Sequence, residues 1–365
     1  MLFRRAARDA LSRQTLRCRS SPRPTFFSSR HLSSVDEDRE KGIASNAKMN
    51  LRGIGQVIFL NSSKSGLVIL GGLAVGDPYL AALAAAGTIS ATTSASFAGI
   101  DKIALQNGLW SYNGCLVGCA TAVFISPLPE SLQSPLLAGA AASGFGVTVA
   151  GAAVSPFVAA ALKPALGSMP QWTFAFNFVT LTMLLRLRPF ADLPEGGPPS
   201  PVNMLPSDQM IGLVANAPLK GLSQIFVVES SLTGAALLSG IGMYSPGLAA
   251  HALLGSSIGS FSAVVLGADA GEIGMGLWGF NSALTSLGVG VFFVNTPQAV
   301  ALSAGGAAAT AAVFGALKIV FGGMEAPCLT LPFCFTMSGL YMLKDAVPGL
   351  TIARDPHSPE KNEPL

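Results

Sequence analysis

The sequence repeats itself, and this internal duplication constrains the possible fold more strongly than any other feature. The segment LRGIGQVIFLNSSKSG (51–66) resembles LKGLSQIFVVESSLTG (219–234), and the glutamines of the two segments lie 168 residues apart. The same offset pairs NGLWSYNGCL (107–116) with MGLWGFNSAL (275–284) without a gap. Extended similarity at one fixed offset indicates two structurally related units. We therefore expect a fold built from two equivalent halves.

Both halves are apolar and carry few charges. Of the 365 residues, 50% are hydrophobic and only 11% are charged, and the mean hydropathy is +0.53. Soluble domains carry about 25% charged residues, so this chain has too little polar surface to cover a soluble globule. The 41 glycines are suited to helices that pack closely in lipid. The composition predicts an all-α integral membrane protein in contact with membrane lipids.

Several apolar segments are too short to cross a bilayer, which takes about 20 residues in a helix. Polar NSSKSG (61–66) interrupts the first half, and ESSLTG (229–234) interrupts the second half at the matching place. Later interruptions fall at MPQWTFAFN (169–177) and EAPCLTLPFC (325–334). Irregular backbone at membrane depth persists only where protein buries it or where it lines a wet cavity. Interruptions at matching positions of two halves therefore indicate a solute path.

The longer apolar runs predict spanning helices near 79–99, 103–125, 136–162 and 172–188. With one further span from the opening stretch, this gives about five spanning helices in each half. An odd number of spans turns the second half upside down relative to the first. The sequence therefore predicts two inverted repeats.

Changes in composition along the chain predict its domain organisation. A basic Ser/Arg-rich tail precedes the first membrane repeat, and a proline-rich linker separates that repeat from the second, which is followed by a polar C-terminal tail. The boundaries of these five segments are 1–48, 49–188, 189–209, 210–347 and 348–365.

The N-terminal tail leaves the membrane of residence open. Up to Ser34 it holds eight arginines and one acidic residue, Asp9, which is the composition of an organellar transit peptide. The alternative is a disordered basic tail on the cytoplasmic side. We therefore expect a multi-pass protein of either the plasma membrane or a mitochondrial (organellar) membrane.

The reactive residues are too scattered for catalysis or metal binding. Five cysteines and three histidines form no zinc-ligand pattern. No nucleophile–base pair, phosphate-binding loop or basic nucleic-acid footprint is present. We therefore expect no enzymatic activity, no cofactor, no metal and no nucleic-acid partner.

Two other classes of transporter are less favoured by the sequence. An ammonium channel would want a histidine pair in its pore, but His251 is alone in the membrane region. A coupled transporter would want buried charges, which are nearly absent.

The motifs LRGxxQVxF, GLWSYN with GLWGFN, and TFAFN (173–177) with TLPFC (330–334) resemble those of the urea transporter family. The resemblance covers about residues 50 to 345. It implies a homotrimer of independent pores, each with ten spanning helices and two re-entrant ones, one in each half. It also implies facilitated, channel-like passage of urea down its gradient.

The resemblance assigns pore residues position by position. Glutamines match the two outer urea sites, aromatic and leucine side chains match the walls of the slot, and threonines match the central constriction. In that order these residues are Gln56 and Gln224; Phe59, its partner Val227, Tyr112, Leu116, Phe280 and Leu284; and Thr173 and Thr330. The chain departs from the family where Ser62-Ser63 and Ser230-Ser231 replace Asn-Pro, and where Phe174-Ala175 replaces Leu-Pro. These departures bear on pore width.

The chemistry of urea explains such a lining. Urea is flat and neutral, and removing its hydrogen-bonding groups from water without replacement costs several kcal/mol per group. Uncharged amides and hydroxyls can replace those bonds, and flat rings can cover its faces. From the residues alone, a buried glutamine such as Gln56 can instead join two helices, and Thr173 or Thr330 can bond back to its own helix. Passage of another small neutral solute, ammonia or a short-chain amide, is the alternative function, and an ion-coupled carrier is less favoured.

Overall fold

The computed structural model describes residues 43–126, 135–187, 201–204 and 206–365, and within them all regular elements are helices. Their only β-structure is three isolated bridges. Residues 1–42 of the predicted N-terminal tail and most of the predicted linker lie outside the described residues, and residues 43–48 of that tail belong to the first described helix. The all-α expectation is therefore confirmed for the part of the chain that the structure describes.

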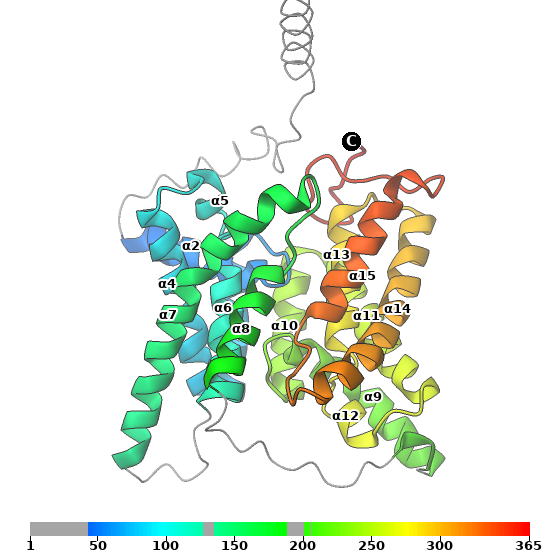
Figure 1. Cartoon of the computed structure of the whole chain (residues 1–365). Coiled ribbons are helices and arrows are strands. Elements are labelled where there is room, and N and C mark those ends of the chain that lie inside the picture. The colour runs from blue at the N-terminus through cyan, green and yellow to red at the C-terminus, as the bar shows by residue number, and fades with distance from the viewer. Residues whose placement is uncertain (1–42, 127–134, 188–200, 205) are drawn as a thin grey trace, which may run out of the picture. The chain divides into compact units, whose positions relative to one another are not determined.

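The helices of the first half precede residue 188 and those of the second half follow residue 200 (Figure 1). The first half contains α2 (Ile43–Gln56), α3 (Ser63–Gly76), α4 (Pro78–Phe97), α5 (Lys102–Gln106), α6 (Tyr112–Ala120) with its π-helical continuation η2 (Thr121–Ile125), α7 (Pro135–Leu166) and α8 (Phe174–Leu187). The second half contains η4 (Val202–Met204), α9 (Ser207–Gln224), α10 (Ser231–Tyr244), α11 (Pro246–Val265), α12 (Ala270–Gly274), α13 (Phe280–Phe292), α14 (Pro297–Gly322), α15 (Leu331–Met342) and η5 (Leu343–Asp345).

Four helical segments among the described residues are long and apolar enough to cross a membrane. They are Pro78–Phe97, Ala142–Leu166, Pro246–Val265 and Pro297–Gly322. Large apolar side chains on the outer faces of α7 and α14 are exposed, among them Phe157 and Ile319. Such faces are expected of helices in contact with lipid tails, where water does not penalise exposed apolar surface. The helices α3, α8, α13 and α15 are equally apolar but too short to cross alone.

The helices are interrupted near each expected place, although α3 and α10 already begin inside NSSKSG and ESSLTG, and each gap contains strained backbone. Phe59 and Val227 have φ angles of 65° and 61°, and they lie in the matching gaps after α2 and α9. Trp172 and Leu329, with φ angles of 44° and 48°, lie in the gaps before α8 and α15. Positive φ in a residue other than glycine costs on the order of 1–3 kcal/mol and is retained mainly at functional sites.

The predicted continuous span over 103–125 is wrong. The structure breaks this segment between α5 and α6, where Gly108 has a φ of 74°. A Cβ on Gly108 would collide with the backbone of Gly53, so only glycine fits this approach. Gly276 repeats the arrangement in the second half, with a φ of 81° and the backbone of Gly221 against it.

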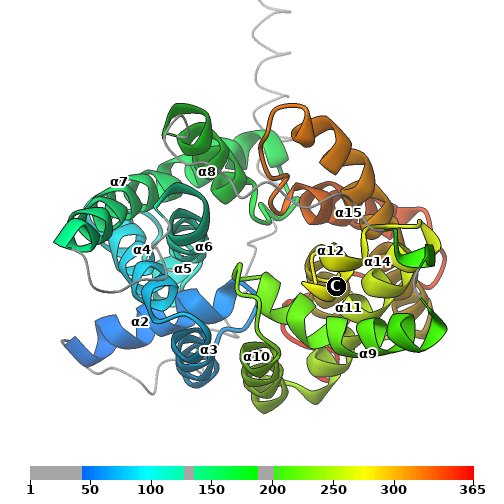
Figure 2. The same ribbon diagram turned by 90° about the horizontal axis from the view of Figure 1, so that it is seen from below.

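The halves lie side by side and contact one another through equivalent elements (Figure 2). In one contact α3 packs on α10, where the small Gly72 leaves room for Ala236, and Gly240 approaches Ile69. In the other contact α8 meets α15. Both contacts join elements that correspond in the duplication, so matching elements of the two halves meet at each contact.

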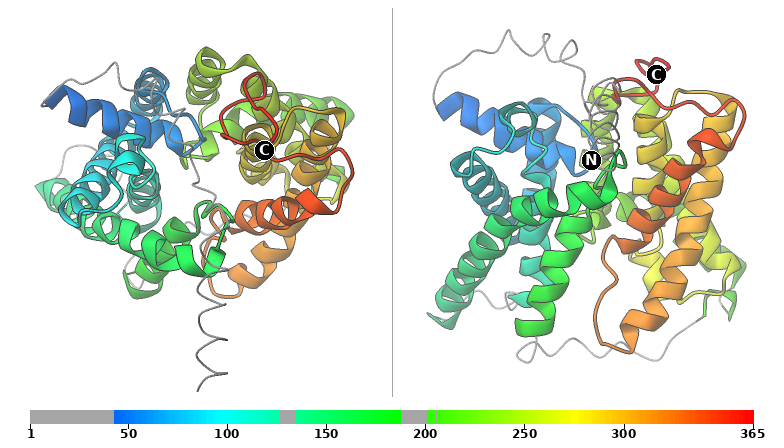
Figure 3. Two further views of the ribbon diagram at one scale, coloured as in Figure 1. Left: turned by 90° about the horizontal axis from the view of Figure 1, so that it is seen from above. Right: turned by 45° about the horizontal axis from the view of Figure 1, so that its top comes forward.

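The C-terminal segment folds back onto one end of the second half (Figure 3). Asn362 donates from Nδ2 to three backbone carbonyls at the end of α13, those of Gly290, Val291 and Phe293. The last carbonyls of a helix have no partner within the helix, and a side-chain amide can donate to them. The predicted polar tail is thus ordered against the helices over residues 351–365.

Candidate functional site

Thr173 and Thr330 meet at the contact between the halves. Thr173 immediately precedes α8 and Thr330 immediately precedes α15, and their Oγ1 atoms lie 2.7 Å apart. Each side chain is only 3% exposed. The N-terminal ends of α8 and α15 therefore meet at one buried polar point.

Asn177 and Cys334 complete the polar cluster around these hydroxyls. Asn177 donates from Nδ2 to Thr330 Oγ1 and to the Thr173 carbonyl, both at 2.8 Å, and its Oδ1 accepts from the Thr330 amide at 3.1 Å. The Cys334 thiol lies 3.2 Å from Thr173 Oγ1. Sequence reasoning assigned neither residue to the site. The sequence signal that could have identified them is their equivalent position, since each is the last residue of its motif, TFAFN or TLPFC.

Two further asparagines hold the N-terminal ends of the half-helices from neighbouring helices. Asn113 of α6 accepts at Oδ1 from the Phe176 amide of α8 at 3.1 Å. Asn281 of α13 accepts from the Phe333 amide of α15 at 3.3 Å and donates to the carbonyl of Leu329 at 3.1 Å. These contacts satisfy backbone groups that every helix end leaves open. Both asparagines belong to the duplicated GLWSYN/GLWGFN motif, although the sequence alone did not reveal their role.

The Tyr112 hydroxyl contacts the interrupted backbone before α8. The hydroxyl donates to the carbonyl of Trp172 at 2.5 Å, immediately before the central threonine. Its repeat partner Phe280 has no hydroxyl and packs edge-on against Phe314, with ring centroids 6.1 Å apart. The predicted wall residues Leu116 and Leu284 are fully buried in the main apolar core.

The two outer glutamines are held in equivalent ways. Gln56 donates from Nε2 to the Asn107 carbonyl at 2.9 Å, and Gln224 donates to the Met275 carbonyl at 3.0 Å. Asn107 and Met275 are themselves repeat partners, and each lies in the break between a short helix and the next helix. Both glutamines are thus fixed beside interrupted backbone, while each retains a side-chain oxygen that can accept a hydrogen bond.

Phe59 belongs to an aromatic cluster that joins the halves. Its ring lies edge-on to Phe292 and Phe333 of the second half, with centroids 5.8 and 6.1 Å away. Trp172 packs edge-on against the same two rings at 5.1 and 5.8 Å, and its indole donates to Ser338 Oγ at 2.9 Å. Val227, the repeat partner of Phe59, is half-buried beside the apolar core. Trp172 and its partners were not predicted, because their repeat counterparts are not all aromatic.

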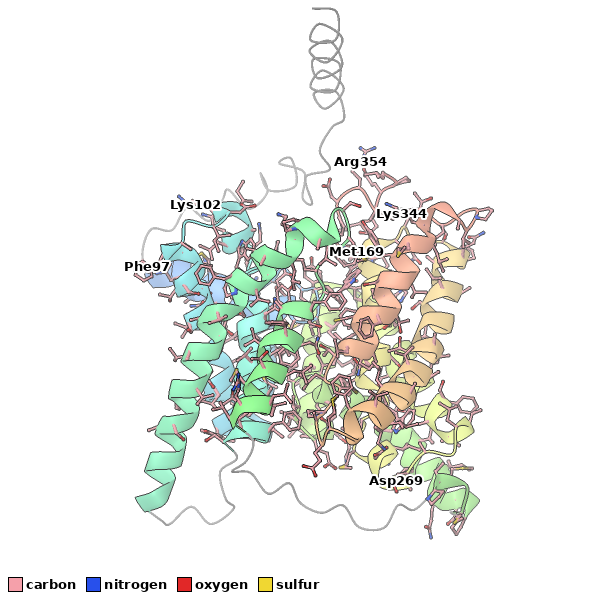
Figure 4. All side chains as sticks on the ribbon, viewed as in Figure 1. Phe97, Lys102, Met169, Asp269, Lys344 and Arg354 are labelled. Carbon is pink, nitrogen blue, oxygen red and sulfur yellow. The ribbon has the colours of Figure 1, made fainter. Side chains whose placement is uncertain are left out.

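The polar groups at the centre are uncharged. The side chains bonded to the two threonines are an amide and a thiol. The ion pairs Lys220–Glu229 and Lys318–Glu272 of the described residues are partly exposed and do not involve the threonines. Labelled charged residues lie at the ends of the helices, with Lys102 and Lys344 at one end and Asp269 at the other (Figure 4). Among the described residues no group of histidine, cysteine, aspartate or glutamate could hold a metal ion.

His251 bonds to serines of neighbouring helices rather than to the central threonines. Its Nδ1 pairs with Ser303 Oγ at 2.9 Å, between α11 and α14. Ser286 of α13 donates to the His251 carbonyl and contacts Ser303 at 2.6 Å. This cluster joins three helices of the second half and satisfies the buried imidazole.

Comparison with known proteins shows which family the chain resembles over most of its length. A family model described as urea transporter matches residues 47–345. The chain is 30% identical over 300 residues to urea transporter 1 of Rattus norvegicus, an alignment that covers 78% of this chain and 73% of that protein. It is 30% identical over 299 residues to urea transporter 1 of Mus musculus and of Ovis aries, with the same coverage. The matched region contains every predicted site residue, and these names describe transporters rather than enzymes.

Proposed function

Because the chain belongs to the urea transporter family, whose model covers residues 47–345, we propose that it conducts urea passively across a membrane. The path runs between the two halves, past the outer glutamines and through the pair of central threonines. The observation that carries this proposal is the contact between Thr173 and Thr330, whose buried hydroxyls bond to each other at 2.7 Å.

The threonine pair is suited to a neutral amide. Each hydroxyl can donate one hydrogen bond and accept two, so the pair can replace the water bonds that urea loses at the constriction. In the absence of solute the hydroxyls satisfy each other, which avoids the penalty for an unpaired buried polar group. Urea passes by exchanging this one bond for bonds to its own carbonyl and N–H groups.

The outer parts of the path are proposed to bind the solute in the same manner. Gln56 and Gln224 are held by backbone carbonyls and offer their side-chain oxygens to urea N–H groups. Phe59, Tyr112 and Phe280 provide flat walls against which the amide plane stacks. Val227, which is the repeat partner of Phe59, and the leucines Leu116 and Leu284 provide apolar walls.

Ions are excluded by the helix ends. The N-terminal ends of α8 and α15 meet at the threonines, and each end carries a partial positive charge. Two such ends in a buried site repel cations, protons included. Since the bonded groups are uncharged, nothing at the centre offers a coupling ion a counter-charge. The transport is therefore downhill and uncoupled.

The architecture we propose is a pair of inverted membrane repeats, 49–188 and 210–347, assembled as a homotrimer. In Figure 1 the repeat partners α5 and α12 lie at opposite ends of the helices, which supports the inversion. Each half would supply about five spanning helices and one re-entrant helix. The trimer and the helix count rest on the family resemblance.

The membrane of residence is the plasma membrane or a mitochondrial membrane. Residues 1–48 fused to a fluorescent protein test this point directly. Import into mitochondria would assign the segment as a transit peptide, whereas a diffuse signal would assign it as a basic tail.

Uptake of labelled urea into proteoliposomes tests the passive mechanism. We expect the internal concentration to reach the external one, and to be unaffected when sodium and proton gradients are collapsed. Accumulation above the external concentration that requires a gradient would replace the channel with a coupled carrier. Parallel uptake of ammonia and acetamide determines whether another small neutral solute is preferred, which would favour the alternative function.

A further inference from the structure

Asn177 and Cys334 occupy equivalent positions in the two half-helices, but they give the central hydroxyls different surroundings. Each lies four residues after its threonine. Asn177 crosses to the other half and donates to Thr330 Oγ1 at 2.8 Å. Cys334 crosses in the opposite direction and brings a thiol to 3.2 Å from Thr173 Oγ1. A carboxamide N–H is a good donor, whereas a thiol is both a weak donor and a weak acceptor.

This difference sets the direction of the hydrogen bonds at the constriction. A hydroxyl carries one proton and two lone pairs. Either hydroxyl can donate in the 2.7 Å contact, but Asn177 already engages one lone pair of Thr330, and this favours donation from Thr330 to Thr173 Oγ1. Thr173 has the weaker thiol beside it and retains acceptor capacity. These surroundings favour Thr330 as the donor of the pair and Thr173 as the acceptor.

Asn177 is itself held rigidly, so that its amide cannot turn over. Its second N–H donates to the Thr173 carbonyl at 2.8 Å, and its Oδ1 accepts from the Thr330 amide at 3.1 Å. Rotating the carboxamide by half a turn would set its oxygen against the Thr173 carbonyl and its NH₂ group against the Thr330 amide N–H, and neither of these backbone groups can reverse its role. These bonds fix the N–H toward Thr330, and they cross the contact between the halves.

We propose that Asn177 is a positioning residue that determines solute specificity by fixing Thr330 as a hydrogen-bond donor. The constriction then receives a solute carbonyl oxygen at Thr330 and a solute N–H at Thr173. Solutes with a strong oxygen acceptor pass in preference to solutes of similar shape with a weaker acceptor. This inference rests on the proposed function, in which the two threonines line the urea path.

Urea and thiourea provide the test, because the sulfur of thiourea is the weaker acceptor and its N–H groups are the stronger donors. We would measure the permeability of both solutes in proteoliposomes by stopped flow, for the full chain and for Asn177→Leu. Without the amide, Thr330 is free to accept, so the urea-to-thiourea permeability ratio should fall roughly three- to tenfold.

Asn113→Leu is the matched control. It removes a buried bond to the same half-helix, at the Phe176 amide, without touching either hydroxyl. Both permeabilities should fall together in this variant, and their ratio should stay at the wild-type value.

A second variant, Asn177→Cys, protects the test against a folding failure. The second half already accommodates cysteine at the equivalent position, Cys334, and the ratio should fall in this variant as well. The urea-to-thiourea ratio could instead stay unchanged in both Asn177 variants while both permeabilities fall as in Asn113→Leu. That result would mean that Asn177 only holds the helices together, and it would overturn the inference. If the unaltered protein conducts no urea above protein-free vesicles, the proposed function fails instead.

Discussion

The Tyr112 hydroxyl donates a hydrogen bond to the Trp172 carbonyl at 2.5 Å, across 60 residues of sequence. Trp172 has a φ of 44° and immediately precedes the central threonine, so this bond supports a strained break at the point where α8 begins. The corresponding carbonyl in the second half, that of Leu329, is held by the Asn281 side chain instead. The two halves therefore stabilise equivalent breaks with different side chains.

Replacing Tyr112 with phenylalanine should destabilise the first-half break. The ring remains, but the Trp172 carbonyl loses its bonded partner, at a cost of about 1 kcal/mol. We expect a lower midpoint of thermal unfolding in detergent, measured by tryptophan fluorescence. A midpoint equal to that of the unaltered protein would show that the bond does not support the break.

Replacing either central threonine with valine should reduce urea permeability by about tenfold, because the shape is kept and a hydrogen-bonding group is lost. Thr180→Val is the matched control. Thr180 lies on the same half-helix and is buried, but its hydroxyl has no hydrogen-bond partner among the described residues. The urea permeability of Thr180→Val should stay close to that of the unaltered protein. Unchanged flux in both Thr173→Val and Thr330→Val would contradict the role of the pair.

Docking of the C-terminal segment should depend on pH through Glu360. Partial burial alone would raise the pKa of this carboxyl, but hydrogen bonds from Ser245 Oγ and the Gly247 amide outweigh burial and lower its pKa from 4.5 to about 2. A lowered pKa means that the folded state favours the charged form. The stabilisation is therefore complete above about pH 4.5 and is lost as the pH falls toward 2.

A dye attached at an introduced Leu365→Cys should report this docking by its fluorescence anisotropy. The anisotropy should be high at neutral pH and fall on acidification, whereas Glu360→Gln should already be low at neutral pH. Glu363→Gln, an exposed carboxyl of the same segment, is the control and should behave as the unaltered protein does. The same anisotropy in Glu360→Gln and Glu363→Gln would mean that Glu360 does not anchor the segment.

The duplication predicted equivalent breaks in the two halves but not which side chains hold them. Local signals such as NSSKSG identified the breaks, and TFAFN with TLPFC identified the threonines, because these patterns depend on neighbouring residues. The roles of Asn113 and Asn281 depend on helices more than 50 residues away, so no local pattern could distinguish them from other buried asparagines. The break at Gly108 was missed because the segment 103–125 was interpreted as one apolar run, despite the polar Gln106 and Asn107 before the glycine. Its cause is the backbone of Gly53, which only the folded chain brings close.

The most direct test of the central claim is stopped-flow urea permeability of the purified full chain in proteoliposomes. We expect permeability well above that of protein-free vesicles, linear in the urea gradient, and reduced by about tenfold in Thr330→Val. Permeability equal to that of protein-free vesicles, or high urea permeability that Thr173→Val and Thr330→Val leave unchanged, would contradict it.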